Sequence, residues 1–236
     1  MNAAIVLSGG VGTRLGANIP KQYIEINGKC ILEYSLSNFF ISDNIQLIVI
    51  VLNQQWKPYV SMFAPEGLFR GKTIVYTHPG ETRQMSILNG LTTIRKMGCK
   101  VDKVIIHDGA RPSVSLEIID KCIKACNDEY MGVMPVIPVK DTIYFSKNGT
   151  SIESLLDRSS LFSGQAPEAF HFNNYLNAHY LLSPEKLLKI NGSSELAHLC
   201  GMKIKLIQGD PENYKITDST DLERFKLKIN ESKHSL

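Results

Sequence analysis

The sequence contains little that would place the protein in a membrane or on a nucleic acid. Its 236 residues include no apolar run long enough to cross a bilayer. The apolar start at residues 3–7 is too short for a signal peptide and follows no basic segment. The net charge is only +3, and the basic residues form no run. We therefore expect a cytoplasmic protein that binds neither nucleic acid nor membranes.

Cysteine is also scarce, and its spacing does not suggest a metal site. The five cysteines are scattered along the chain at Cys30, Cys99, Cys122, Cys126 and Cys200. Cys122 and Cys126 lie four residues apart, but no C-x-x-C pair and no histidine cluster accompanies them. We expect buried thiols rather than metal ligands.

What the sequence does contain is a globular composition and two alternating patterns. Hydrophobic residues make up 43% and charged residues 21%, and the length suits one domain over residues 1–236. Val- and Ile-rich runs, typical of strands covered on both faces, occur at 3–7, 46–52, 73–76, 103–106 and 132–136. Helical spacing occurs at 31–40, 83–97 and 116–125. The alternation predicts a Rossmann-like three-layer α/β fold, with a mostly parallel sheet and helices on both faces.

One segment breaks this alternation. Residues 139–156 read V-K-D-T-I-Y-F-S-K-N-G-T-S-I-E-S-L-L, and Asn148-Gly149 is a strong signal for a tight hairpin turn. We expect an inserted β-hairpin arm at about residues 139–158. An ordinary hairpin on the protein surface is an interpretation of equal weight.

The loop after the first strand is rich in glycine. Gly9, Gly10 and Gly12 free the backbone to turn sharply and to direct N–H groups at an anion. The loop lacks the Gly-Lys-Ser/Thr ending of a P-loop and the third glycine of the dinucleotide fingerprint. In an open parallel sheet, such a loop lies at the edge where ligands bind. A purely structural turn is the alternative.

Two cations flank this loop and favour a phosphate ligand. Arg14 lies within it, and Lys21 follows Pro20, whose fixed backbone angle helps to aim the lysine. A triphosphate attacked at its α-phosphorus gains charge on its oxygens, and fixed cations stabilise that charge. We therefore predict that Arg14 and Lys21 are catalytic.

The complete set of motifs resembles a family of nucleotidyltransferases. The chain reads G-G-x-G-T-R-L-G, then P-K-Q-Y, H-D-G-A-R-P, V-K-D-T, D-R and N-Y-K-I-T in order along the sequence. This order resembles the cytidylyltransferases that act on 2-C-methyl-D-erythritol 4-phosphate or ribitol 5-phosphate. The resemblance extends from residue 3 to about residue 226 and implies transfer of CMP from CTP, with Mg²⁺ as cofactor and release of pyrophosphate.

The resemblance also implies roles for individual residues. Those expected to bind CTP are Ser8, Gly9, Gly10, Gly12, Gly80, Glu81, Ser86 and Asp108, and Asp108 is also a possible indirect ligand of Mg²⁺. Those expected to bind the acceptor are Arg111, Thr142, Arg158 and Lys215, of which Arg158 and Lys215 count as catalytic with Arg14 and Lys21. The arm is expected to reach across a twofold axis into a partner's site, which implies a homodimer. Arg83 also lies in this region. The alternative to a functional role for it is that of an ordinary solvated residue on a helix.

The acceptor is left open between the two polyol phosphates. Residues 191–195 read N-G-S-S-E where the family has a Thr-Asp motif, in a region that touches the acceptor. A non-catalytic protein that binds a nucleotide or phosphate on the same fold is the alternative function. The cations at 14, 21, 158 and 215 argue against it.

Overall fold

A computed structural model describes residues 1–10 and 19–234, with side chains to residue 231. Within these residues, nine strands form one sheet in the order β11-β8-β12-β7-β1-β4-β6-β5, and β13 also pairs with β8. The strands are β1 (Asn2–Leu7), β4 (Leu47–Val51), β5 (Gly67–Phe69), β6 (Lys72–Thr77), β7 (Lys103–Asp108), β8 (Gly132–Pro138), β11 (Phe162–Gly164), β12 (Glu168–His171) and β13 (Ile204–Gln208).

The centre of the sheet is parallel, as the sequence predicts. β1 pairs in parallel with β4 and β7, β4 with β6, and β13 with β8. The five predicted strands are β1, β4, β6, β7 and β8, each within two residues of its predicted start and end. The carboxyl ends of these strands therefore meet at one edge, which is where ligands bind in open α/β sheets.

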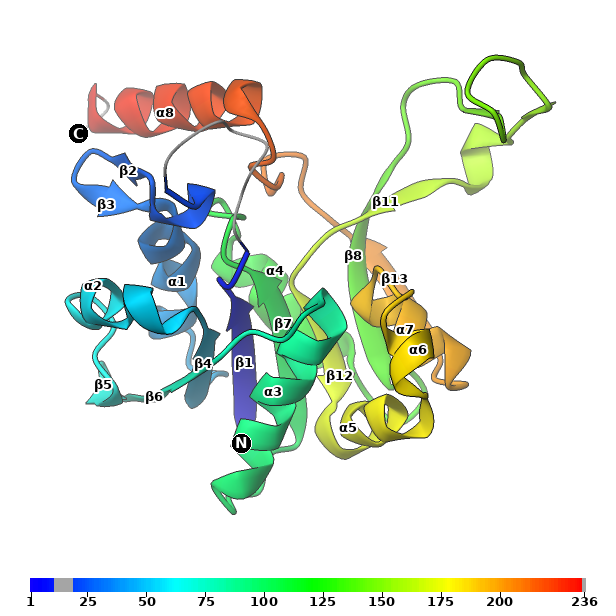
Figure 1. Cartoon of the computed structure of the whole chain (residues 1–236). Helices are drawn as coiled ribbons and strands as arrows, with labels where there is room; N and C mark the ends of the chain where they lie inside the picture. Colours follow the sequence, from blue (N-terminus) through cyan, green and yellow to red (C-terminus); the bar gives the residue numbers. More distant parts are fainter. Residues whose placement is uncertain (11–18, 235–236) are drawn as a thin grey trace.

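Helices cover both faces of the sheet (Figure 1). They are α1 (Ile31–Ile41), α2 (Lys57–Ser61), α3 (Arg83–Lys96), α4 (Leu116–Ala125), α5 (Phe172–Leu181), α6 (Pro184–Leu187), α7 (Ser193–Leu199) and α8 (Ser219–His234). Ile105 packs with α1 and α4 in the core on one face, whereas its neighbour Ile106 packs with α3, α5 and α7 on the other. Alternate strand residues thus fill two separate cores, and the three-layer fold is confirmed.

The C-terminal helix lies against a small N-terminal hairpin. β2 (Glu25–Ile26) pairs with β3 (Lys29–Cys30), and Ile26 packs with Phe225 of α8 in a third buried cluster. Figure 1 shows α8 beside this hairpin, at the end of the molecule where the central strands finish. The chain just before α8 is thereby held near the loop that follows β1.

The inserted arm is present as a hairpin. β9 (Tyr144–Phe145) pairs antiparallel with β10 (Ser154–Leu155), and Gly149 in the connecting loop has a φ of 72° that favours glycine. In Figure 1 the arm leaves the sheet between β8 and β11 and projects away from the body. The predicted arm is therefore observed.

None of the helices among the described residues is both long and apolar enough to span a bilayer. The cytoplasmic location stays a prediction.

Candidate functional site

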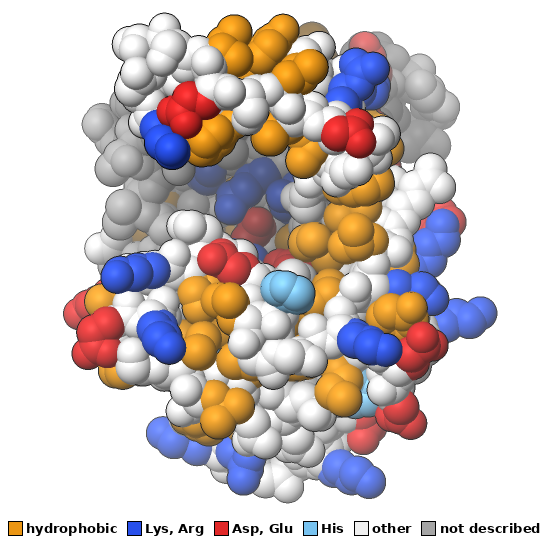
Figure 2. Space-filling view, turned by 90° about the vertical axis from the view of Figure 1, so that its right-hand side faces the viewer, with side chains coloured by type: hydrophobic (Ala, Val, Ile, Leu, Met, Phe, Trp, Pro, Cys, Tyr) orange, Lys and Arg blue, Asp and Glu red, His pale blue; other side chains and the backbone are white. Residues whose placement is uncertain are grey.

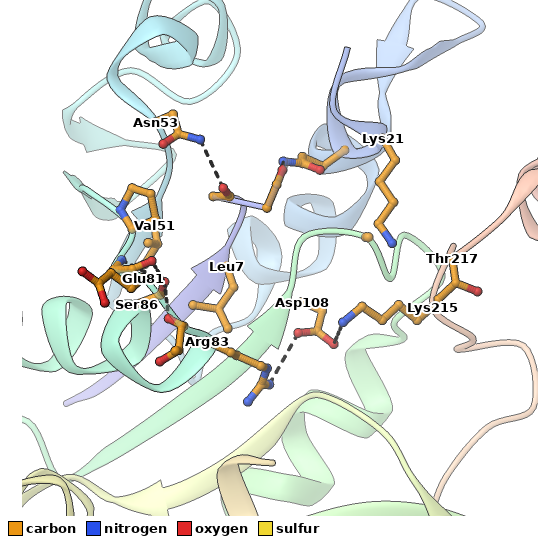
Figure 3. Close-up of a pocket in the computed structure, with 17 residues that line it drawn as sticks. Leu7, Lys21, Val51, Asn53, Glu81, Arg83, Ser86, Asp108, Lys215 and Thr217 are labelled. Carbon is orange, nitrogen blue, oxygen red and sulfur yellow. Dashed lines mark hydrogen bonds and ion pairs between the residues drawn. The ribbon is translucent and has the colours of Figure 1, made fainter. Parts of the chain in front are cut away.

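A cleft opens where the parallel strands end. Its volume is ≈ 750 Å³, within the usual range of small-molecule sites. The loop after β1, the start of α3, the end of β7 and the segment before α8 contribute its walls (Figure 3). These four segments are far apart in sequence, and the parallel sheet brings them to one edge.

The side chain of Gln22 holds the backbone that directly follows β1. Gln22 donates hydrogen bonds from its side-chain amide to the carbonyls of Ser8, at 2.8 Å, and Gly10, at 2.7 Å. The Ser8 hydroxyl donates to the Tyr23 hydroxyl at 3.0 Å, and the Tyr23 ring stacks on Trp56. The P-K-Q-Y motif therefore supports the glycine loop as well as supplying Lys21. The backbone at residues 8–10 is thus already held in place, which lowers the entropic cost of binding a ligand there.

The wall opposite is formed by the loop before α3. The Thr82 side chain accepts a hydrogen bond from the Met85 N–H and caps the helix, while the Ser86 hydroxyl accepts one from the Gly80 N–H at 3.0 Å. The two walls meet tightly, because a Cβ atom on Gly9 would lie 2.4 Å from Cβ of Pro79. Glycine at position 9 is thus required by close approach.

The floor of the cleft carries one carboxylate among three cations. Asp108 ends β7, and its Oδ2 lies 3.1 Å from Nζ of Lys215 and 3.4 Å from Nε of Arg111. Its Oδ1 lies 3.4 Å from Nη2 of Arg83 (Figure 3). Asp108 therefore holds three cations in place, and these still outnumber the carboxylates when Glu168, which also faces Arg83, is counted.

This arrangement fixes the protonation states of the floor. Burial alone would raise the pKa of Asp108, but Arg83, Lys215 and Arg111 outweigh it and hold that pKa well below its usual range. Burial lowers the pKa of the neighbouring His107 to about 4, so this imidazole is neutral at pH 7. Asp108 is therefore ionised and His107 neutral at pH 7.

The structure brings together most of the residues predicted from the sequence. Those that line the cleft are Gly9, Gly10, Lys21, Gly80, Glu81, Ser86, Asp108 and Lys215. Ser8 and Arg111 are not in its walls: Ser8 is buried beneath the loop, and Arg111 donates to the Asn213 carbonyl at 2.8 Å. Gly12 and Arg14 lie outside the described residues. The roles assigned to all of these residues stay predictions.

Two predicted acceptor-binding residues lie on the arm, away from this cleft. Thr142 and Arg158 are exposed, and Arg158 donates to the Lys140 carbonyl at 2.7 Å. Neither side chain lines the cleft of its own chain.

Arg83 is the residue that the sequence interpretation undervalued. It does not extend into solvent as an ordinary helix residue would: its side chain is 25% exposed and pairs with Asp108. Its place at the first position of α3, directly after the Gly80–Thr82 loop, was the available signal. Gln22 and Asn53 also line the cleft, and the Asn53 amide donates to the Gly9 carbonyl at 3.1 Å.

The carboxylates of the cleft suit a metal ion that binds together with a phosphate-bearing ligand. No group of three or more His, Cys, Asp or Glu side chains within residues 1–10 and 19–231 could hold a metal ion alone. Mg²⁺ in nucleotide sites is commonly held by substrate phosphates with one or two carboxylates. Asp108 at the floor and Glu81 on the wall are the carboxylates that line the cleft.

Comparison with known proteins agrees with this geometry. Residues 2–230 match the family model of 2-C-methyl-D-erythritol 4-phosphate cytidylyltransferase. The chain belongs to this family. A protein of that name from Clostridium beijerinckii is 36% identical over 225 residues, which cover 94% of this chain and 95% of the relative. The family resemblance inferred from the motifs is therefore confirmed.

The cytidylyltransferase family includes relatives with other names and lengths. A ribitol-5-phosphate cytidylyltransferase from Streptococcus agalactiae is 29% identical over 228 residues, covering 96% of this chain and 94% of the relative. The chain spans about half the length of the curated relatives called bifunctional enzyme IspD/IspF. The example from Wolbachia pipientis is 32% identical, over 98% of this chain and 56% of the relative.

Solved structures of the family share the fold. A 4-diphosphocytidyl-2C-methyl-D-erythritol synthase from Anaerococcus prevotii superposes with a TM-score of 0.80 at 24% identity, covering 97% of this chain and 95% of the other.

The close approach at Gly9 predicts a stability difference between two adjacent glycines. Gly9→Ala should lower the free energy of unfolding by about 1–3 kcal/mol, the usual cost of forcing an extra carbon into a packed site. Gly10→Ala is the matched control, since a Cβ there meets no atom within 4 Å. Urea unfolding of both variants measures the difference, and equal effects would contradict the packing argument.

The low pKa of Asp108 predicts how stability depends on pH. The folded-state pKa lies below the unfolded value of about 3.9, so the stabilisation is complete above that value and is lost as pH falls. At pH 7 the free energy of unfolding of the wild type should exceed that of Asp108→Asn by about 1.5–3 kcal/mol. The difference should shrink below about pH 4. Urea titrations from pH 3 to 7 test this, with exposed Asp43→Asn as control. A difference independent of pH would refute the ion-pair account.

Proposed function

We propose that the chain, as one nucleotidyltransferase domain, transfers CMP from CTP to a phosphorylated polyol and releases pyrophosphate. An oxygen of the acceptor phosphate attacks the α-phosphorus of CTP. The new P–O bond forms as the bond from the α-phosphorus to the oxygen that bridges to the β-phosphate breaks. No covalent enzyme intermediate is required.

The observation that carries this proposal is the charged floor of the cleft beneath a glycine loop. Two phosphorylated substrates repel each other, and their meeting requires cations fixed in advance. Lys21 lines the cleft on the side of the glycine loop, and Lys215 and Arg83 lie at the floor around Asp108 (Figure 3). In Figure 2, Lys and Arg side chains gather inside the hollow of the molecule.

Each wall of the cleft suits one part of CTP. The Gly9–Gly10 backbone and Lys21 suit the triphosphate, and the Gly80–Thr82 loop with Ser86 suits the cytidine. Lys215 suits the acceptor phosphate, which must approach the α-phosphorus in line with the leaving pyrophosphate. Arg14 is proposed to act with Lys21 on the triphosphate.

Mg²⁺ is proposed to enter with CTP. Asp108 would hold it indirectly, because the carboxylate oxygens already face three cations. When bound, the ion supplies neutralising charge to the phosphate oxygens.

The preferred acceptor is 2-C-methyl-D-erythritol 4-phosphate, after which the matching family model and several of the relatives are named. The Streptococcus relative favours ribitol 5-phosphate as the second candidate. The comparisons lend no support to a non-catalytic protein.

A pyrophosphate-release assay with CTP, Mg²⁺ and each polyol phosphate tests the function. Wild type should release pyrophosphate with at least one acceptor. Lys215→Ala should lower the rate by roughly 10²-fold, as for the loss of one fixed charge donor. Lys121→Ala, which removes an exposed ion pair on α4, is the control and should act like wild type. The absence of release with both acceptors would overturn the proposal.

We also propose that the arm completes the cleft of a partner chain in a homodimer. Tyr144, Phe145 and Leu155 on its two strands are 55%, 44% and 62% exposed, which is unusual for a packed hairpin in a lone chain. Thr142 and Arg158 are expected to bind the acceptor, but neither lines the cleft of its own chain.

Mixing two inactive variants tests the shared site. If Lys21 of one chain works with Arg158 of the other, a heterodimer of Lys21→Ala and Arg158→Ala has one site with both changes and one intact site. Activity should recover to about half of wild type per heterodimer when chains exchange. Heterodimers that form but stay inactive would refute arm exchange, and so would a fully active monomer at high dilution.

A further inference from the structure

A buried carboxylate beside the cleft is not explained by the roles above. Glu168 is the first residue of β12 and is only 6% exposed. A carboxylate is rarely buried unless it is paired and hydrogen-bonded, because removing it from water is costly. The sequence offered no reason to single it out.

The sheet places Glu168 at the ligand edge. β12 runs antiparallel between β7 and β8, so its first residue lies where the parallel strands end. Glu168 is opposite Ile106 of β7, which is two residues before Asp108. Because strand side chains alternate between faces, Glu168 and Asp108 lie on the same face, the one covered by α3.

The two oxygens of Glu168 have different partners. Oε2 accepts hydrogen bonds from Ser194, at 2.9 Å from the backbone N–H and 2.6 Å from the hydroxyl. Oε1 lies 3.6 Å from Nη2 of Arg83. One oxygen is therefore fixed to α7, and the other faces the guanidinium of α3.

Arg83 is thus held from three sides. Its Nη2 faces both Asp108 and Glu168, and its Nη1 donates to the Ser193 hydroxyl. Although burial opposes its charge, these two carboxylates raise the pKa of Arg83. The guanidinium has five N–H groups. The Nε hydrogen and one Nη1 hydrogen remain beyond these three contacts, in a side chain that lines the cleft.

We propose that Glu168 is a positioning residue, which fixes the Arg83 guanidinium at the floor so that it binds an oxygen of the polyol-phosphate acceptor. This inference rests on the proposed function. Arg83 shares Asp108 with Lys215, the cation assigned to the acceptor phosphate (Figure 3). Acceptor affinity should therefore depend on Glu168, and CTP affinity should not.

A double-mutant cycle separates this role from simple structural support. Glu168→Gln should raise the KM for the acceptor roughly tenfold, of the order of one weakened charge-assisted hydrogen bond, with the KM for CTP within about twofold. In an Arg83→Gln background, Glu168→Gln should have little further effect. The proposal would be overturned if Glu168→Gln raised the acceptor KM by the same factor in the wild-type and Arg83→Gln backgrounds. It would also be overturned if Glu168→Gln changed the KM for the acceptor and the KM for CTP equally.

Two further variants keep the test decisive if Glu168→Gln folds poorly. Ser194→Ala removes one hydrogen bond to Oε2 and keeps both charges, so it should raise the acceptor KM in the same direction by a smaller factor. Glu117→Gln, which breaks an exposed ion pair with Lys121 on α4, should leave both KM values unchanged. An unchanged acceptor KM in Ser194→Ala would refute the role.

Crystal structures of wild type and Glu168→Gln test the positioning without any turnover. The Arg83 guanidinium should stay beside Asp108 in wild type and leave it in the variant. An unmoved guanidinium would overturn the proposal. A wild type that is inactive with every acceptor would overturn the proposed function instead, and the two failures are therefore distinct.

Discussion

The pairing of Asp108 with three cations is the interaction on which the site depends. Arg83 comes from α3, Arg111 from the turn after β7, and Lys215 from the segment before α8. Each cation would repel the other two if the carboxylate were absent. Asp108 therefore joins three parts of the chain at the floor of the cleft.

The fold supplies the rest by directing loops to one edge. Four parallel strands end together at the centre of the sheet, and the antiparallel β12 starts there. Asp108 on the parallel strand β7 and Glu168 on the antiparallel strand β12 therefore both face Arg83, although they are 60 residues apart in sequence. The buried Gln22 and Tyr23 then hold the backbone at Ser8, at the edge where the parallel strands end.

The sequence predicted the parts of the structure that rest on local patterns. Continuous Val and Ile runs identified the five central strands, because strands buried on both faces need such runs. Asn148-Gly149 indicated the hairpin, but the connection between Phe145 and Ser154 is longer than the two-residue turn that this pair favours. The motifs named the cleft residues at positions 9, 10, 21, 80, 81, 86, 108 and 215.

What the sequence could not predict depends on contacts between distant residues. β12 has four residues, too few for a recognisable period, so the position of Glu168 beside Asp108 follows only from the pairing with β7. Arg83 reads as a solvated helix residue until its helix is placed over the sheet. Only the folded chain shows that Thr142 and Arg158 do not line the cleft of their own chain.

A crystal structure of the protein with CTP and Mg²⁺ tests the central claim most directly. We expect cytosine against the Gly80–Thr82 loop and Ser86, the triphosphate against the Gly9–Gly10 backbone and Lys21, and the α-phosphate facing Lys215 and Asp108. A nucleotide bound outside this cleft, or a triphosphate that contacts neither Lys21 nor the glycine loop, would contradict it.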